Sequence, residues 1–278
     1  ILWGTNIVST HVHMVPFVEE AKIRGAKIIC IDPRETRTAA ISDWHIQPKP
    51  GTDAALALGM MHEIVKNKKH DLAFLKKHTT GYKEFLEKIL PKYTLDKVSR
   101  ITGIKKSDIK QLAFEYGSTK KTYIRPNYGL NRHRNGGMMV RSIMLLPAIT
   151  GAWKNKSSGC FVGSIEEMWN VDLGKLQRPD LLKDKKPRSI NMIQIGNALN
   201  DKKLDPPIKS LFVWNSDVAN CAPDSISVRK GLKRKDLFTV VHETFWTDSC
   251  DYADIVLPAD TQLEHMDLHA PYGHYYFS

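Results

Sequence analysis

Residues 27–36, Lys-Ile-Ile-Cys-Ile-Asp-Pro-Arg-Glu-Thr, join a continuous apolar run to a polar turn. An unbroken run of this kind, rich in β-branched residues, is typical of a parallel strand that is buried on both faces. Upstream, the apolar positions of residues 10–24 fit a helix roughly, and Gly25 would end that helix. With the short strand-like phrase at residues 1–3, the order is strand, helix, strand. The sequence therefore predicts a parallel βαβ unit with a polar turn after its second strand.

Three short phrases follow one another in a fixed order near the start of the chain: Trp3-Gly4-Thr5-Asn6, Asp32-Pro33-Arg34-Glu35-Thr36 and Gly51-Thr52-Asp53. Each closes an apolar run or opens a helical one, and these are the places where an open α/β sheet holds its ligands. A glycine lets the backbone approach a ligand closely. A carboxylate at a strand end commonly binds a ribose hydroxyl, and an arginine can bind phosphate through two parallel hydrogen bonds. Together the phrases predict a nucleotide site.

Each phrase also has a purely structural interpretation. Gly4-Thr5-Asn6 alone is more often a turn, and either Thr52 or Asp53 could cap the helix predicted from residue 54 to about 65. The functional alternative for Asp53 is specific, because a carboxylate accepts hydrogen bonds from the adjacent ring N–H and amino groups of guanine. The occurrence of all three phrases in one βαβ unit favours the ligand site.

The composition indicates a globular α/β protein. The chain has 278 residues, of which 42% are hydrophobic and 26% charged. Strand signals recur at residues 122–124, 210–214, 238–241 and 254–257. We therefore expect a first α/β dinucleotide-binding domain over residues 1–120 and a second over 121–278, with an irregular excursion at about 154–190. No apolar run approaches the roughly 20 residues of a membrane helix, so we expect no membrane segment in this chain.

The distribution of charge and the spacing of the cysteines argue against a nucleic-acid-binding protein and against a cysteine-ligated metal site. The net charge of +11 is spread over small lysine groups without interleaved aromatic residues, which favours a solvated surface over a nucleic-acid interface. None of the four cysteines, at positions 30, 160, 221 and 250, belongs to a Cys-x-x-Cys pair, so no metal ligand is expected among them. The Gly-x-Gly-x-x-Gly, Walker, Gly-x-Ser-x-Gly and His-Glu-x-x-His motifs are missing as well.

In this order, Trp-Gly-x-Asn, Asp-Pro-Arg-x-Thr and Pro-Gly-Thr-Asp-Ala-Ala-Leu resemble the molybdopterin oxidoreductases. This family includes formate dehydrogenases, nitrate reductases, polysulfide reductases and dimethyl sulfoxide reductase, many of which serve anaerobic respiration. The second half is similar to the same family in residues 128–137, 141–151, 214–217 and 241–245, and in Tyr-Ala-Asp-Ile-Val-Leu-Pro-Ala at 252–259. The resemblance covers essentially the whole chain.

The resemblance implies two Rossmann-like, doubly wound sheets that hold bis(molybdopterin guanine dinucleotide) with molybdenum or tungsten. Trp3 and the residues of the three phrases would hold one dinucleotide. The second dinucleotide, or the pterin, would face residues of the second half: Tyr128, Arg132, Asn215, Ser216, His242 and Glu243. Arg132 stands where several members have Gln, which leaves open whether it contacts cofactor or substrate. His242 and Glu243 could also simply end a strand.

In family members the protein ligand to the metal lies upstream of Trp-Gly-x-Asn, as does an iron–sulfur segment in many of them. We therefore expect this chain to be an internal piece that is inactive alone, with a 4Fe-4S cluster in the upstream part and no metal ligand of its own. The identity of the catalytic residues stays open. A small-molecule substrate and an iron–sulfur electron-transfer subunit are the expected partners. The substrate, the choice of metal and the compartment, whether cytoplasmic, periplasmic or membrane-associated through partners, stay open.

Two alternatives to an oxidoreductase belong to other classes of protein. Relatives of such enzymes serve as non-catalytic scaffold subunits of respiratory complexes, in which case Asp32 and Asp53 would be free to diverge, yet both are present. A plain nucleotide-binding module would bind a guanine nucleotide without the pterin.

Overall fold

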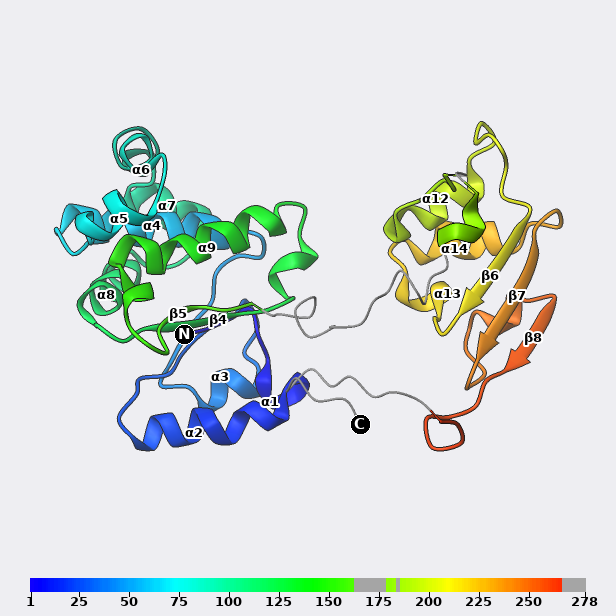
Figure 1. Cartoon of the computed structure of the whole chain (residues 1–278), viewed down its shortest axis with the longest axis horizontal. Helices are drawn as coiled ribbons and strands as arrows, with labels where there is room; N and C mark the ends of the chain where they lie inside the picture. Colours follow the sequence, from blue (N-terminus) through cyan, green and yellow to red (C-terminus); the bar gives the residue numbers. More distant parts are fainter. Residues whose placement is uncertain (163–178, 184–185, 267–278) are drawn as a thin grey trace. The chain divides into compact units, whose positions relative to one another are not determined.

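The computed structural model describes residues 1–162, 179–183 and 186–266, and it divides into two compact units, Ile1–Ser164 and Ile165–Ser278 (Figure 1). Each unit has its own parallel sheet and its own buried core.

The sheet of the first unit has five strands in the order β3-β2-β1-β4-β5, and all neighbouring pairs are parallel. The strands are β1 (Leu2–Trp3), β2 (Ile29–Ile31), β3 (Trp44–Ile46), β4 (Tyr123–Pro126) and β5 (Gly159–Cys160). The chain order runs outward on both sides of β1. This order is that of a doubly wound sheet, whose ligands bind where the order reverses, beyond the carboxyl ends of the central strands.

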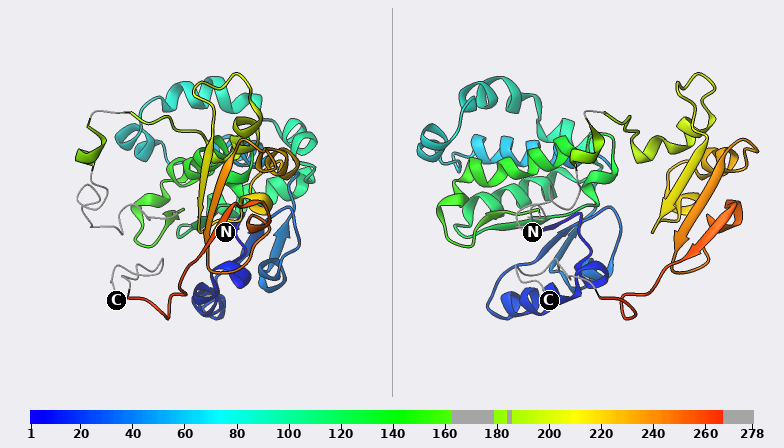
Figure 2. Two further views of the ribbon diagram at one scale, coloured as in Figure 1. Left: turned by 90° about the vertical axis from the view of Figure 1, so that its right-hand side faces the viewer. Right: turned by 45° about the vertical axis from the view of Figure 1, so that its right-hand side comes forward.

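Helices cover both faces of this sheet (Figure 2). One face carries α1 (Ile7–Thr10), η1 (Val12–Met14), α2 (Val15–Ile23) and α3 (Arg37–Ile41). The remaining helices of the unit are α4 (Asp53–Lys66), α5 (Leu72–His78), α6 (Tyr82–Glu84), the π-helical turn η2 (Phe85–Ile89), η3 (Leu90–Lys92), α7 (Leu95–Thr102), α8 (Lys106–Ser118), η4 (Leu130–Arg132), α9 (Gly136–Thr150) and η5 (Ala152–Lys154). Helices α5 and α6 are separate elements, and the chain turns between them near Gly81, whose φ is +74°.

Helix α4 is the centre of the first core. Leu56, Met60 and Met61 on this helix are fully buried. Gly59 lets α7 approach closely, because a Cβ at that position would lie 2.8 Å from Cγ2 of Val98. The helix is thus packed on several sides, and its first residue, Asp53, is fixed at the edge of the sheet.

The boundary between the units lies near residue 164, whereas the sequence predicts a boundary near residue 120. The reason is strand pairing. The strand at 123–126 was expected to open the second domain, but it hydrogen-bonds to β1 with Trp3 opposite Pro126. Gly159 and Cys160, in the expected excursion, form β5 beside β4. Other parts of that excursion, 163–178 and 184–185, lie outside the described residues.

The second unit has a three-stranded parallel sheet in the order β6-β7-β8. Its strands are β6 (Ser210–Trp214), β7 (Phe238–Glu243) and β8 (Ile255–Pro258), and its helical segments are η6 (Pro179–Leu182), η7 (Met192–Gln194), α12 (Ile195–Asn200), α13 (Val218–Cys221), α14 (Ser225–Leu232) and η8 (Cys250–Tyr252). Helices α12, α13 and α14 lie on one face (Figure 1). On the other face, Phe212 and Trp214 are 60% and 73% exposed among the described residues.

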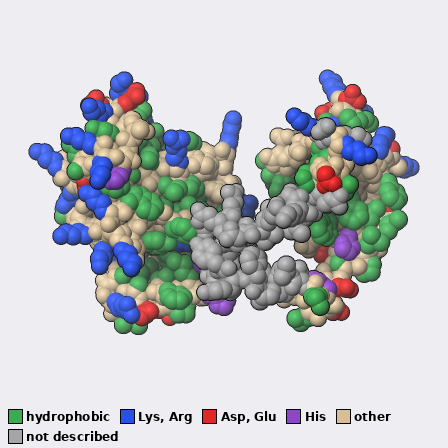
Figure 3. Space-filling model, in the orientation of Figure 1, with side chains coloured by type: hydrophobic (Ala, Val, Ile, Leu, Met, Phe, Trp, Pro, Cys, Tyr) green, Lys and Arg blue, Asp and Glu red, His purple; other side chains and the backbone are tan. Residues whose placement is uncertain are grey.

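Lysine and arginine side chains are spread over the visible surface of both units (Figure 3). Among the described residues, no helix is both long enough and apolar enough to cross a membrane.

Candidate functional site

Four loops meet at the carboxyl edge of the first sheet. They follow β1 at Gly4–Asn6, β2 at Asp32–Thr36, β3 at Gln47–Thr52 and β4 at Asn127–Asn135. Because the carboxyl ends of parallel strands lie at one edge, the fold brings the three predicted phrases together. The fourth loop was not assigned to this site from the sequence.

Asp53 is the first residue of α4, and its side chain is only 5% exposed. Its Oδ1 accepts a hydrogen bond of 2.8 Å from the indole Nε1–H of Trp3, which is fully buried at the end of β1. Thr52 is the N-cap residue but makes no side-chain capping bond, because its hydroxyl donates to the carbonyl of Lys49 instead. The Asp53 carboxylate is therefore held by a strand residue, 50 positions away in the sequence.

Several effects act in opposite directions on the pKa of the Asp53 carboxylate. Burial raises its pKa above the ordinary value, and the hydrogen bond from Trp3 is the largest of the effects that oppose this. His133 lowers the pKa further and Asp32 raises it. The backbone amide of Asp53 also lowers this pKa by a hydrogen bond to its own carboxylate. In the described part of the chain, Oδ2 accepts no hydrogen bond from another residue. This oxygen can accept a hydrogen bond from a ligand.

The loop after β4 is tied to two of the other loops. The Asn127 amide donates to Thr5 Oγ1 at 3.2 Å, and the Asn135 amide donates to the carbonyl of Gly51 at 3.0 Å. A Cβ at Gly129 would lie 2.8 Å from the carbonyl oxygen of Gly4, so glycine is required for this approach. The loop after β4 is thus part of the same site as the first and third phrases.

Tyr128 and Arg132 lie on this loop and are exposed. The sequence predicts both in the second domain, whereas the structure has them in the first unit because β4 belongs to the first sheet. Asn127, His133 and Asn135 belong to the same loop but were not selected from the sequence. The spacing of Gly129 and Gly136, two glycines that permit close backbone approach, was the signal for this loop.

Several predicted site residues make hydrogen bonds that stabilise the loops in which they lie. Asn6 Oδ1 accepts from the hydroxyl of Thr38 at 2.9 Å, and Thr36 caps α3 by accepting from the amide of Ala39. Asp32 Oδ1 accepts from the backbone amide of Arg34 at 2.9 Å. Pro33, Arg34 and Glu35 are exposed on this turn. The Arg34 guanidinium has no hydrogen-bond or ion-pair partner within residues 1–162, 179–183 and 186–266, which leaves it able to bind an anion.

The four predicted residues of the second unit also come together at a carboxyl edge. Asn215 and Ser216 follow β6, while His242 and Glu243 end the neighbouring strand β7. The amide of Asn215 donates to the carbonyl of His242 at 3.0 Å. Asn215 has a φ of +50°, a conformation that is uncommon for a residue other than glycine. Glu243 Oε1 accepts from the amide of Thr244.

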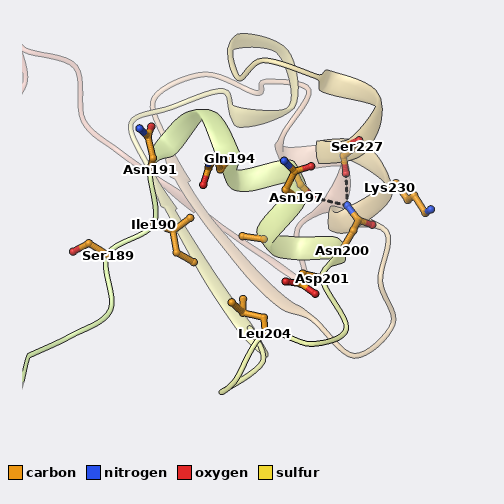
Figure 4. A pocket seen from close by; sticks show the side chains of 12 residues that line it. Ser189, Ile190, Asn191, Gln194, Asn197, Asn200, Asp201, Leu204, Ser227 and Lys230 are labelled. Carbon is orange, nitrogen blue, oxygen red and sulfur yellow. Dashed lines mark hydrogen bonds between the residues drawn. The ribbon is translucent and has the colours of Figure 1, made fainter. Parts of the chain in front are cut away.

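Two hollows lie elsewhere in the described part of the chain. One of about 550 Å³ in the second unit is lined by polar side chains that include Asn197, Asn200, Asp201 and Lys230 (Figure 4). Its Asn200 amide donates to the carbonyls of Gly196 and Ser227 and so serves helix packing. Another, of about 900 Å³, is lined by residues 24–29 and 114–123, at the amino ends of β2 and β4. None of the predicted site residues lines either hollow.

The cysteines and other metal-binding side chains form no metal site in the described part of the chain. No group of three His, Cys, Asp or Glu side chains is placed there to hold an ion. Cys30 and Cys160 are buried next to the first core, and burial raises their pKa values to about 11 and about 12. Such thiols are protonated and inert at neutral pH.

Comparison with known proteins shows the family of this chain. A family model described as "Molybdopterin oxidoreductase" matches residues 1–271. The probable oxidoreductase YoaE of Bacillus subtilis is 47% identical over 99% of this chain, and formate dehydrogenase H of Escherichia coli is 29% identical over 95%. The chain spans about 40% of the length of each of these relatives.

The structure is also similar to that of acetylene hydratase from Pelobacter acetylenicus, with a TM-score of 0.75 and 24% identity. This match covers 98% of the chain and 42% of the hydratase. The α/β fold class expected from the sequence and the family resemblance are both confirmed.

Proposed function

Since this chain belongs to the molybdopterin oxidoreductase family, we propose that it is the cofactor-binding central region of an enzyme that uses bis(molybdopterin guanine dinucleotide). Members of the family are oxidoreductases with molybdenum or tungsten bound to a pterin. The proposal adds the identity of the dinucleotide and the residues that hold it.

The Asp53 carboxylate is the observation that carries the proposal. It is buried at the carboxyl edge of the sheet and is held by Trp3, whose bond uses only one of the two lone pairs of Oδ1. Guanine presents two adjacent donors, a ring N–H and an amino group, to which a carboxylate is complementary. Adenine and cytosine present an acceptor next to a donor, so a carboxylate would leave one of their groups unpaired and would disfavour them.

The neighbouring loops fit the rest of one dinucleotide. Arg34 carries an unpaired guanidinium on the turn after β2, where it binds the pyrophosphate. Gly51 has a φ of +78°, which turns the backbone toward Asp53 without a Cβ in the path of the ligand. Asp32, at the strand end, binds the ribose hydroxyls. Tyr128 and Arg132, which are exposed on the loop after β4, would contact the pterin portion.

In the second unit, the cluster of Asn215, Ser216, His242 and Glu243 holds the other dinucleotide. The left-handed backbone at Asn215 supports this assignment, because strained residues of this kind cluster at functional sites. These side chains offer both donors and acceptors to a polar ligand.

When bound, the cofactor supplies oxygen-atom, hydride and electron transfer. The residues of this chain bind and orient it, and they keep its guanine ends out of water. In this proposal the protein ligand to the metal and a 4Fe-4S cluster belong to an upstream part of the polypeptide. Electrons then pass to or from an iron–sulfur subunit, and the substrate is a small molecule.

The proposal is tested on the full-length polypeptide purified without air. Elemental analysis should find molybdenum or tungsten, and acid hydrolysis should release two GMP per metal atom. Asp53→Ala should reduce the GMP content, while Asp96→Ala, which removes an exposed carboxylate paired with Lys106 on α7 and α8, should not. A protein with neither metal nor GMP would instead be the non-catalytic scaffold, and GMP without pterin would indicate a plain nucleotide-binding module.

A further inference from the structure

The hydrogen bond between Trp3 and Asp53 joins two elements that are distant in the sequence. Trp3 ends β1 and Asp53 begins α4, and both side chains are almost completely inaccessible to solvent. The indole N–H is a donor only and has no other partner within the described residues. A buried donor of this kind costs free energy unless it is paired, so the bond is maintained in the folded protein.

The core fixes the position of the indole. Trp3 belongs to the first hydrophobic cluster together with Ile31 and Leu130. The next residue, Gly4, has a φ of +60°, and a Cβ there would lie 2.9 Å from Cγ of Leu130. The strand end therefore has little freedom to shift, and the oxygen that accepts from the indole is fixed with it. The orientation of the second oxygen follows, because the carboxylate is planar.

We propose that Trp3 is a positioning residue that orients the Asp53 carboxylate toward the guanine base and thereby sets the preference of this site for guanine. The inference rests on the proposed function, since it presumes that a guanine nucleotide binds at this edge. Trp3 does not touch the ligand in this proposal, and it acts only through Asp53.

A neutral donor is suited to this role. A lysine or arginine in the place of Trp3 would neutralise the carboxylate and compete with the guanine donors for it. The indole removes part of the cost of burying the carboxylate and leaves its negative charge for the ligand. The other titratable groups that act on Asp53 are His133 from the loop after β4, which favours the charged form, and Asp32 from the loop after β2, which disfavours it.

The proposal gives a pH dependence with a definite sign. Guanine binding needs the ionised carboxylate, so it weakens as the pH falls through the pKa of Asp53. Burial raises that pKa and the bond from Trp3 lowers it. Loss of the indole N–H therefore moves the midpoint of the binding profile to higher pH. A role of Trp3 in packing alone would not move this midpoint.

The test compares GDP with IDP, which lacks only the 2-amino group of the base. Calorimetric titration of the 278-residue chain should show tighter binding of GDP. In Trp3→Phe, which keeps an aromatic ring but removes the N–H, the ratio of the two affinities should fall about tenfold, the effect of one hydrogen bond to a charged group. The control Trp44→Phe changes a half-buried tryptophan of β3 that contacts Lys27 instead of Asp53, and the ratio should be unchanged.

The outcomes separate the two proposals. No preference for GDP in the unaltered chain overturns the guanine assignment of the proposed function, and the inference with it. A clear preference that Trp3→Phe leaves intact, with an unshifted pH profile, overturns the inference alone.

Two more variants complete a double-mutant cycle, which separates an action of Trp3 through Asp53 from an independent effect of Trp3→Phe. Asp53→Asn replaces one carboxylate oxygen by an amide at constant shape and should abolish the preference. In the Trp3→Phe/Asp53→Asn double variant no further loss is expected, because Trp3 acts through Asp53. Losses in the GDP to IDP ratio that simply add would contradict this, and circular dichroism of each variant monitors its folding.

Discussion

At the scale of single residues, the site depends on backbone positions as much as on side chains. Gly4, Gly51 and Gly129 each occupy a place where a Cβ would introduce strain or a collision. Gly51 is the one nearest to Asp53 in sequence, and its surroundings have room, since the nearest atom to a Cβ there would be His133 Nδ1 at 3.7 Å. A substitution at this residue therefore tests conformation alone.

Gly51→Ala should destabilise the folded chain by about 1–2 kcal/mol, the cost of a left-handed backbone for a residue with a Cβ. Gly25→Ala is the matched control, because Gly25 has a φ of +89° with nothing within 4 Å of a Cβ and lies outside the site. Urea denaturation should show similar losses for both variants. Only Gly51→Ala should also weaken GDP binding, and an equal effect of Gly25→Ala on binding would argue against a role of this turn in the site.

The cysteines give a second prediction at this scale. Cys221 is exposed, whereas Cys30, Cys160 and Cys250 are buried. Burial raises the pKa values of Cys30 and Cys160 to about 11 and about 12, so their thiolate forms are scarce at pH 8. Iodoacetamide should therefore add one group rapidly to the native chain, at Cys221, as mass spectrometry of the intact chain and its peptides can show. Rapid labelling of Cys30 in folded protein would contradict the buried environment.

At the scale of elements, the strand-helix-strand order and the phrases at the strand ends could be predicted from the sequence. These features are local, because an apolar run of residues and the polar turn that follows it lie next to each other in the chain. The sheet to which a strand belongs is not local. The residues at 123–126 do not indicate which strand they will pair with. The pairing of β4 with β1 and the unit boundary near 164 could therefore not be predicted.

The same distinction explains which site contacts were missed. The bond from Trp3 to Asp53 spans 50 positions, and that from Asn135 to Gly51 spans 84. Neither residue pair has a spacing that a motif would reveal. Asn127, His133 and Asn135 become recognisable only when the loop after β4 is seen beside the loops after β1 and β3. Thr52 and Asp53 could not be separated as caps from the sequence, since both residue types favour that position.

Packing of α4 gives a prediction for a helix. Alanine has a better helix propensity than glycine by about 1 kcal/mol, yet Gly59→Ala would bring a Cβ within 2.9 Å of both methyl groups of Val98. Forcing extra volume into a packed core costs about 1–3 kcal/mol, so we expect a net loss of stability. Gly137→Ala, in α9 with nothing within 4 Å of a Cβ, should leave stability unchanged or raise it. Urea denaturation of both variants is the measurement.

At the scale of the whole molecule, the two units have separate cores of different size. The first core joins buried residues from β1, β2, β4 and the helices around α4. The described core of the second unit consists of two small clusters, one around Leu199 and one around Val241. A smaller core contributes less hydrophobic stabilisation. The second unit should therefore be the less stable of the two.

Chemical denaturation should accordingly show two transitions, with the second unit unfolding first. Cys250 and Cys160 report on the two units separately, since each is buried in a different core. Thiol labelling should reach Cys250 at a lower urea concentration than Cys160. Leu199→Ala should shift only the first transition, and Ile124→Ala only the second, each by about 2–5 kcal/mol. A single transition in which both thiols become reactive together would show that the units unfold as one.

The contacts between the loop after β4 and the loops after β1 and β3 limit how this protein can be engineered. Asn127, Gly129 and Asn135 connect that loop to Thr5, Gly4 and Gly51 in turn. Consider a chimaera in which residues 127–136 come from a relative with a different substrate. The new loop would not match the residues at positions 4, 5 and 51 that it has to contact. Grafts of this segment should succeed only when the residues at positions 4, 5 and 51 are transplanted with it as one cassette.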